Sequence, residues 1–139
     1  GLTRIGLEHR ITDVFEPDMM IPSVGQGVVC MECRTDDADA VAALAAINHA
    51  LTFTITMAER TMLQALGGSC HTPIGAYCTQ KDETTLELVG MVSNLAGTQI
   101  LRTSHVGEIS NPEALGQKVA EDLLAQGARE ILDMCEAAA

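Results

Sequence analysis

The second half of the chain carries short apolar stretches with turn-forming residues between them. Three stretches fit strands, and the turn-forming segments 81–84 and 94–97 separate them. These stretches are 74–79, 86–93 and 99–106. Because connections this short join antiparallel strands, the pattern predicts a three-stranded antiparallel sheet.

A helical pattern precedes the predicted sheet. Residues 51–66 carry leucine, isoleucine and methionine at helical spacing, and the pattern stops at Gly67 and Gly68. The β-forming residues at 52–56 compete with it, but strong helix formers follow them. We therefore expect one helix over the whole of 51–66.

Two further helices are predicted after the strands. Asn111 and Pro112 form a helix start, and an apolar stripe runs from there to Gly127. Residues 128–135 fit a short last helix. One helix, three strands and two helices in this order predict an α+β fold, with the helices on one face of the sheet.

The first third of the chain is less regular. Residues 1–11 fit a short helix, and 21–27 form a connector rich in proline and glycine. The compact apolar run 28–34 is typical of a buried strand. Asp36 and Asp37 then supply the N-cap of an alanine-rich helix.

Composition limits the class of protein. With 139 residues, the chain can form one domain or two small ones, and 47% hydrophobic content is enough for a core. A net charge of −11 with only 8 basic residues argues against nucleic acid or an anionic membrane as partner. No apolar run approaches the roughly 20 residues that span a bilayer. Five cysteines without a regular spacing indicate free thiols, and hence a cytoplasmic protein.

Cys70 occupies the most informative loop. It follows the glycine pair that ends the 51–66 helix, and Pro73 prevents the helix from resuming. Glycines leave the space beside the sulfur open, so we expect a ligand to reach the thiol. The alternative is that Cys70 is a small apolar residue in a turn.

Three short sequence motifs around this loop resemble motifs of one enzyme family. They are Ala-Glu-Arg at 58–60, Leu-Gly-Gly-Ser-Cys at 66–70 and Thr-Pro-Ile-Gly at 72–75. Together they resemble the C-terminal portion of porphobilinogen deaminase (hydroxymethylbilane synthase). The resemblance implies that Cys70 carries a dipyrromethane cofactor through a thioether.

The resemblance also implies further cofactor-binding residues. The segment 22–27 is similar to the family's Pro-x-x-Gly-Gln-Gly stretch, so Gln26 and Gly27 are expected to line the cleft. Arg4 corresponds to an arginine that binds cofactor or substrate carboxylates. Without the resemblance, Arg4 would be read as a solvated helix residue.

The domain organisation follows from the same resemblance. Residues 1–21 correspond to the tail of domain 2, and 22–27 to a hinge. Residues 28–48 correspond to a strand–helix segment of domain 1, separated here from most of its sheet. Residues 49–139 correspond to the C-terminal domain 3, which carries the cofactor cysteine.

The family is a transferase of tetrapyrrole and heme biosynthesis. It condenses four porphobilinogen molecules head to tail into hydroxymethylbilane and releases ammonia. The family's catalytic aspartate lies in a His-Ser-x-Lys-Asp sequence that this chain lacks. We therefore expect no catalytic residue here, a requirement for the N-terminal domains, and a partner role toward porphobilinogen and the growing pyrrole chain. Glu59 is expected to pair with Arg60 or Arg102.

Two other classes of function remain open. The chain could be a non-catalytic α+β interaction module, which fits its acidic surface. A structural metal site could combine Cys30, Cys33, Cys70 and His71. We expect no metal, because three residues along a strand place the sulfurs of Cys30 and Cys33 on opposite faces. A Cys70–His71 nucleophile pair is also disfavoured, because adjacent side chains on an extended loop point apart.

Overall fold

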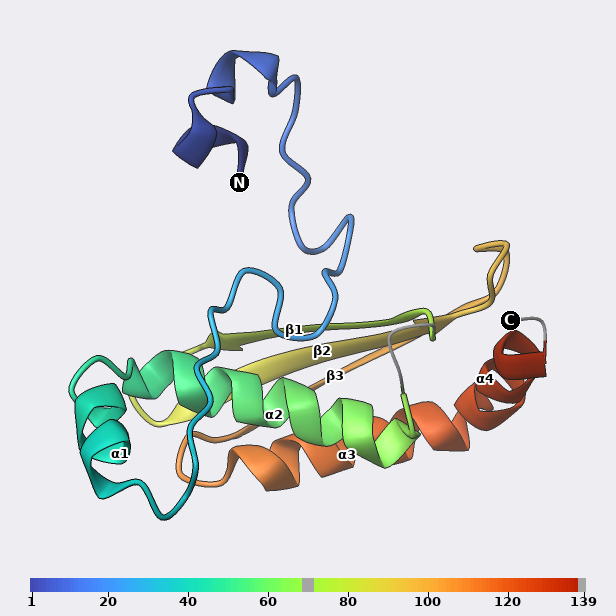
Figure 1. The fold of residues 1–139 in the computed structure, drawn as a ribbon. Helices are drawn as coiled ribbons and strands as arrows, with labels where there is room; N and C mark the ends of the chain where they lie inside the picture. The colour runs from blue at the N-terminus through green and yellow to red at the C-terminus, as the bar shows by residue number, and fades with distance from the viewer. Residues whose placement is uncertain (69–71, 138–139) are drawn as a thin grey trace.

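The computed structural model describes residues 1–68 and 72–137. Within these residues, two short 3-10 helices near the N-terminus are followed by four α-helices and three strands (Figure 1). In chain order the elements are the 3-10 helices Leu2–Ile5 and Glu8–Arg10, α1 Ala38–Ala45, α2 Ala50–Leu66, β1 Ile74–Gln80, β2 Thr85–Ser93, β3 Ile100–Glu108, α3 Pro112–Ala125 and α4 Ala128–Ala137.

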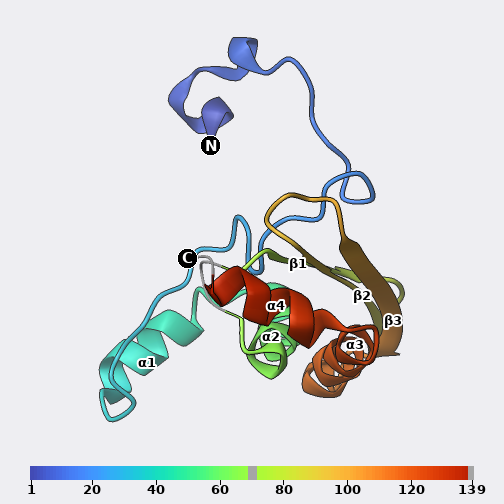
Figure 2. The same cartoon turned by 90° about the vertical axis from the view of Figure 1, so that its right-hand side faces the viewer.

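The three strands form one antiparallel sheet in the order β1-β2-β3. The register places Leu88 of β2 opposite Cys78 of β1 and His105 of β3. Helices α2 and α3 lie side by side beneath one face of the sheet, and Figures 1 and 2 agree on this arrangement. The predicted α+β fold with helices on one face is thus confirmed.

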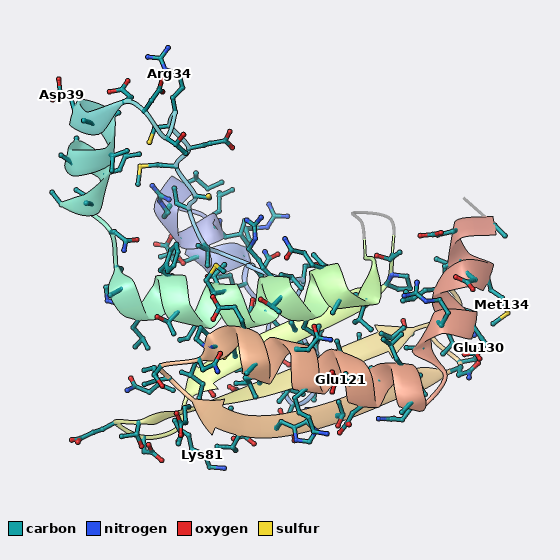
Figure 3. All side chains as sticks on the ribbon, turned by 90° about the horizontal axis from the view of Figure 1, so that it is seen from below. Arg34, Asp39, Lys81, Glu121, Glu130 and Met134 are labelled. Atoms are coloured by element: carbon teal, nitrogen blue, oxygen red, sulfur yellow. The ribbon has the colours of Figure 1, made fainter. Side chains whose placement is uncertain are left out.

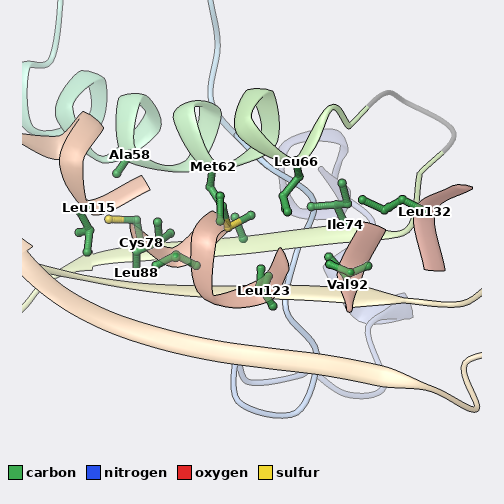
Figure 4. Packing of buried hydrophobic residues seen from close by; sticks show 14 of the residues in the cluster. Ala58, Met62, Leu66, Ile74, Cys78, Leu88, Val92, Leu115, Leu123 and Leu132 are labelled. Carbon is green, nitrogen blue, oxygen red and sulfur yellow. The ribbon is translucent and has the colours of Figure 1, made fainter. Parts of the chain in front are cut away.

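The core between the sheet and the helices is aliphatic. Leu88 and Val92 point from β2 toward the helices, and Met62, Leu66 and Leu123 meet them from α2 and α3 (Figure 4). All five side chains have no exposed surface. Burial of this apolar surface is the main favourable contribution to the stability of the module.

Side-chain caps at the starts of α1 and α3 come from residues that the sequence analysis named. The Asp37 carboxylate accepts a hydrogen bond from Ala40 N at 3.1 Å at the start of α1. Asn111 Oδ1 accepts one from Ala114 N at 3.3 Å at the start of α3. Both caps stand where the sequence predicts them.

Gly116 allows α2 and α3 to approach closely. A Cβ atom at this position would overlap the carbonyl oxygen of Ala58. The same Cβ would lie 2.8 Å from Thr61 Cβ and 3.0 Å from Met62 N. No side chain therefore fits between the two helices at this point.

The first third of the chain differs from the sequence prediction. Residues 28–34 form no strand and are mostly exposed, and residues 1–11 form two 3-10 helices instead of one α-helix. A buried strand needs neighbours for its backbone hydrogen bonds, and the sheet pairs no described strand with 28–34. The N-terminal segment reaches away from the sheet in Figures 1 and 2.

The helices were compared with the length and apolar character that a membrane-spanning helix needs. Within residues 1–68 and 72–137, no single helix is long and apolar enough to cross a membrane. Helices α1 and α2 meet that test only as a pair, bent by 105°.

Candidate functional site

The end of α2 is built around the glycine pair that precedes Cys70. Gly67 adopts a left-handed conformation with φ of 72°, and its N–H donates to Gln64 O at 3.0 Å. Gly68 N donates to Leu63 O at 2.9 Å. A Cβ on Gly68 would overlap Leu63 Cδ1 and lie 2.6 Å from Ile74 Cδ1. The backbone conformation at Gly67 therefore favours glycine, and a side chain on Gly68 would require the Leu63 and Ile74 side chains to shift.

The start of β1 is fixed equally well. Pro73 O accepts a hydrogen bond from Ser93 N at 3.0 Å, and Ile74 is only 8% exposed in the core. The chain that leads into and out of residues 69–71 is thus held by the sheet and by α2. Cys70 and His71 themselves lie outside the described residues, and their predicted roles stay predictions.

Arg129 of α4 brings a positive charge to the end of α2. Its Nη1 atom lies 3.5 Å from the place that a Cβ on Gly67 would take. Figure 3 shows α4, with its labelled Glu130, beside this end of α2. The sequence carries no signal for this neighbour, because the contact joins two helices that are far apart in the chain.

Gln26 and Gly27 lie on an exposed turn. Gln26 N donates to Ser23 O at 3.0 Å, and Gly27 has a φ of 81°. Arg4 lies on the first 3-10 helix and is exposed. The structure places Arg4 apart from the end of α2, on the segment that reaches away from the sheet.

Glu59 is the one buried charged side chain among the described residues, at 6% exposure. Its Oε2 accepts a hydrogen bond from Gly25 N at 2.8 Å, and its Oε1 accepts one from Cys78 N at 2.9 Å. The expected pairing with Arg60 or Arg102 is wrong, since no ion pair within the described residues joins them, and Arg102 donates to Asp18 O at 2.8 Å.

The spacing of Glu59 from the apolar residues of α2 indicates that its side chain is buried. It stands four residues after Ile55 and three before Met62, on the buried stripe of α2. A charged residue on such a stripe needs hydrogen-bond partners inside the fold. Its partners could not be read from the sequence, because both are backbone amides of distant segments.

Burial changes the acidity of two groups at this contact. Desolvation raises the pKa of the Glu59 carboxyl, and the hydrogen bonds from Gly25 and Cys78 offset part of that rise. Burial, and then the nearby Glu59 carboxylate, raise the pKa of the Cys78 thiol to about 12. Cys78 is therefore a packed thiol of low reactivity.

The other described cysteines show no metal arrangement. Cys30 is exposed and Cys33 is half-buried. Within the part of the chain that the structure describes, no group of three or more His, Cys, Asp or Glu side chains could hold a metal ion. The proposed ligands Cys70 and His71 are outside that part.

Comparisons with known proteins give two family matches. Residues 53–125 match the model for the porphobilinogen deaminase C-terminal domain. Residues 1–42 match the model for the porphobilinogen deaminase dipyromethane cofactor binding domain. Cys70 falls in the first match, whereas Arg4, Gln26 and Gly27 fall in the second.

Curated relatives cover nearly the whole chain. Proteins named porphobilinogen deaminase from Gloeobacter violaceus, Methylobacillus flagellatus and an Exiguobacterium species are 44%, 43% and 42% identical to it. The alignments cover 96%, 95% and 95% of this chain, but only 40%, 42% and 43% of the relatives. The chain thus spans about two-fifths of the length of these relatives. Since the C-terminal domain model alone matches more than half of its residues, the chain belongs to the porphobilinogen deaminase family.

Proposed function

We propose that this chain is the C-terminal part of a porphobilinogen deaminase and that Cys70 Sγ anchors a dipyrromethane cofactor as a thioether. The observation that supports the proposal is the position of Cys70 in the sequence. It lies inside the C-terminal domain match, between a helix end and a strand start that are both held by the core. A residue that anchors a cofactor must itself be held in place, and the fixed end of α2 and start of β1 on either side of the loop would do this.

The described neighbours of the loop suit a covalently held acidic group. The dipyrromethane carries carboxylates, and the Arg129 guanidinium lies beside Gly67 at the start of the loop. We further propose that Arg4, Gln26 and Gly27 bind or line the cofactor, which agrees with the name of the family model that covers them. Other parts of the enzyme would bring Arg4 toward the loop.

In this proposal the chain contributes positioning. When bound, the cofactor supplies the pyrrole carbon to which substrate units are added. Cys70 holds the far end of the growing chain, so that each addition becomes intramolecular in effect. Four porphobilinogen molecules would be joined into hydroxymethylbilane with release of ammonia.

Proton transfer is assigned to the N-terminal part of the enzyme. This chain would therefore be inactive without those domains, which are its main protein partner. The four described cysteines are free thiols, which supports our further proposal of a cytoplasmic location.

A chimera tests this function. The aligned C-terminal part of the Gloeobacter violaceus protein is replaced by this chain, and consumption of porphobilinogen is measured. We expect activity in the chimera, none in its Cys70→Ser variant, and unchanged activity in the control Cys30→Ser. An inactive but folded chimera, or an active Cys70→Ser variant, would contradict the proposal. The first result would favour a non-catalytic interaction module.

A further inference from the structure

Strand β1 is at the edge of the sheet, yet two of its outward-facing amides are occupied. Ala76 N donates to Pro22 O at 3.0 Å, and Cys78 N donates to Glu59 Oε1 at 2.9 Å. An open edge strand would leave these donors free to pair with another chain. Here the segment before α1 and the Glu59 carboxylate cover the edge together.

The same segment packs on the module through its side chains. Ile21 is only 8% exposed, and its Cγ2 lies 3.1 Å from the place that a Cβ on Gly75 would take. Val24 packs against the core cluster. Gly25 N then donates to Glu59 Oε2 at 2.8 Å. Residues 21–25, which we call the strap, are therefore docked at both ends and through Val24, while Ser23 is exposed.

Burial of the chain falls where the strap ends. Gln26 and Gly27 are exposed, and Gly27 has a φ of 81°. Residues 28–32 are exposed as well. Among the described residues, the last hydrogen bond between this part of the chain and α2 is the one between Gly25 and Glu59.

We propose that Glu59 is a positioning residue that clamps the strap to the edge of β1. The strap then moves with the C-terminal module, and on the C-terminal side of the strap the chain can pivot only from Gly27 onward. The pivot would therefore lie at the C-terminal end of the predicted hinge 22–27, and the rest of that segment would not bend. The clamp is a property of the fold; only its consequence, a fixed direction for Gln26 toward the cofactor, depends on the proposed function.

The chemistry of the carboxylate predicts how substitutions act. Glu59 has two acceptor oxygens for two amide donors, whereas glutamine has one oxygen and a donor group. In Glu59→Gln the remaining oxygen should stay with Cys78 N, since that hydrogen bond is buried and the one to Gly25 is only partly buried. A buried donor costs more to leave unpaired than one that water can reach. Gly25 should therefore be released first.

Amide hydrogen exchange by NMR on the 139-residue chain tests the clamp. In Glu59→Gln we expect exchange of the Gly25 amide to accelerate about tenfold, the effect of losing one charge-assisted hydrogen bond. The Cys78 amide and the Leu88 amide of the central strand should keep their rates. The control Glu83→Gln removes an exposed charge and should leave all three amides unchanged.

The alternatives are distinguishable. An unchanged Gly25 rate in Glu59→Gln would overturn the clamp. Equal acceleration of Gly25 and Leu88 would also overturn it, because Glu59 would then support only global stability. Glu59→Ala should accelerate both Gly25 and Cys78, and if that variant does not fold, Glu59→Gln decides alone. Failure of the clamp would leave the role of Cys70 untouched, because Gly25 exchange does not involve the cofactor.

Discussion

Substituting Gly116 by alanine should separate the two helices that support the sheet. The new Cβ would overlap Ala58 O and stand 2.8 Å from Thr61 Cβ, well inside the usual carbon–carbon contact of about 3.5–4.0 Å. The Ala58 oxygen is a backbone atom that cannot rotate away, so α3 must shift by about 1 Å. Overpacking of this severity costs about 3 kcal/mol, and the better helix propensity of alanine returns about 1 kcal/mol. We expect a net loss of about 2 kcal/mol.

Urea unfolding followed by circular dichroism measures this loss. With a slope of about 2 kcal/mol per molar urea, the midpoint should fall by about 1 M. Gln117→Ala is the matched control, because it changes the next, exposed residue of α3 and should shift stability by less than about 0.5 kcal/mol. A Gly116→Ala midpoint equal to or above that of the wild type would refute the close approach of α2 and α3.

Three further predictions concern a helix cap, the thiols and a buried carboxyl. Asn111→Ala should lower the free energy of unfolding by about 1 kcal/mol through loss of the α3 cap, and an unchanged urea midpoint would argue against the cap. With a disulfide reagent at pH 8, Cys30 and Cys33 should react in the native protein while Cys78, with a pKa of about 12, reacts only on unfolding; early labelling of Cys78 in peptide mass spectra would be inconsistent with its burial. Burial raises the pKa of Glu59 in the folded state, so the folded protein binds a proton at this carboxyl more tightly than the unfolded chain does. The free energy of unfolding of the wild type, compared with that of Glu59→Gln, should therefore rise as the pH falls through the folded-state pKa and fall again as the pH rises through it. A difference independent of pH would contradict the raised pKa.

The regular part of the fold was predictable because its signals agree. In α2 the apolar stripe, the helix formers and the terminal glycines all indicate a helix, and they outweighed the β-forming residues at 52–56. The three strands are joined by short turns, so their antiparallel pairing followed from the sequence. Local patterns suffice where each element packs on its sequence neighbours.

The strand expected at 28–34 failed for a different reason. Its apolar run is genuine, but a strand exists only when another strand receives its hydrogen bonds, and none of the described strands does so. A sequence pattern indicates the environment to which a segment is suited. It does not show whether a neighbouring strand is present to pair with that segment. The exposure of Val29 and Met31 illustrates the result, at 77% and 51%.

At the candidate site, sequence reasoning identified the loop but not its surroundings. Gly67 and Gly68 were expected to end α2, and the structure shows a left-handed residue and a packed backbone there. The environment of Glu59 was misjudged, because hydrogen bonds to Gly25 and Cys78 join segments that are 34 and 19 residues away. Such long-range polar contacts leave no periodic signal in a sequence.

The central claim is that Cys70 carries the cofactor, and denaturing intact-mass spectrometry of the enzyme that contains this chain tests it most directly. We predict an added mass equal to two linked pyrrole units, mapped by peptide digestion to Cys70 and absent from the Cys70→Ser variant. The same added mass should persist in Cys33→Ser. An unmodified Cys70 in active enzyme, or an adduct on another residue, would contradict the account.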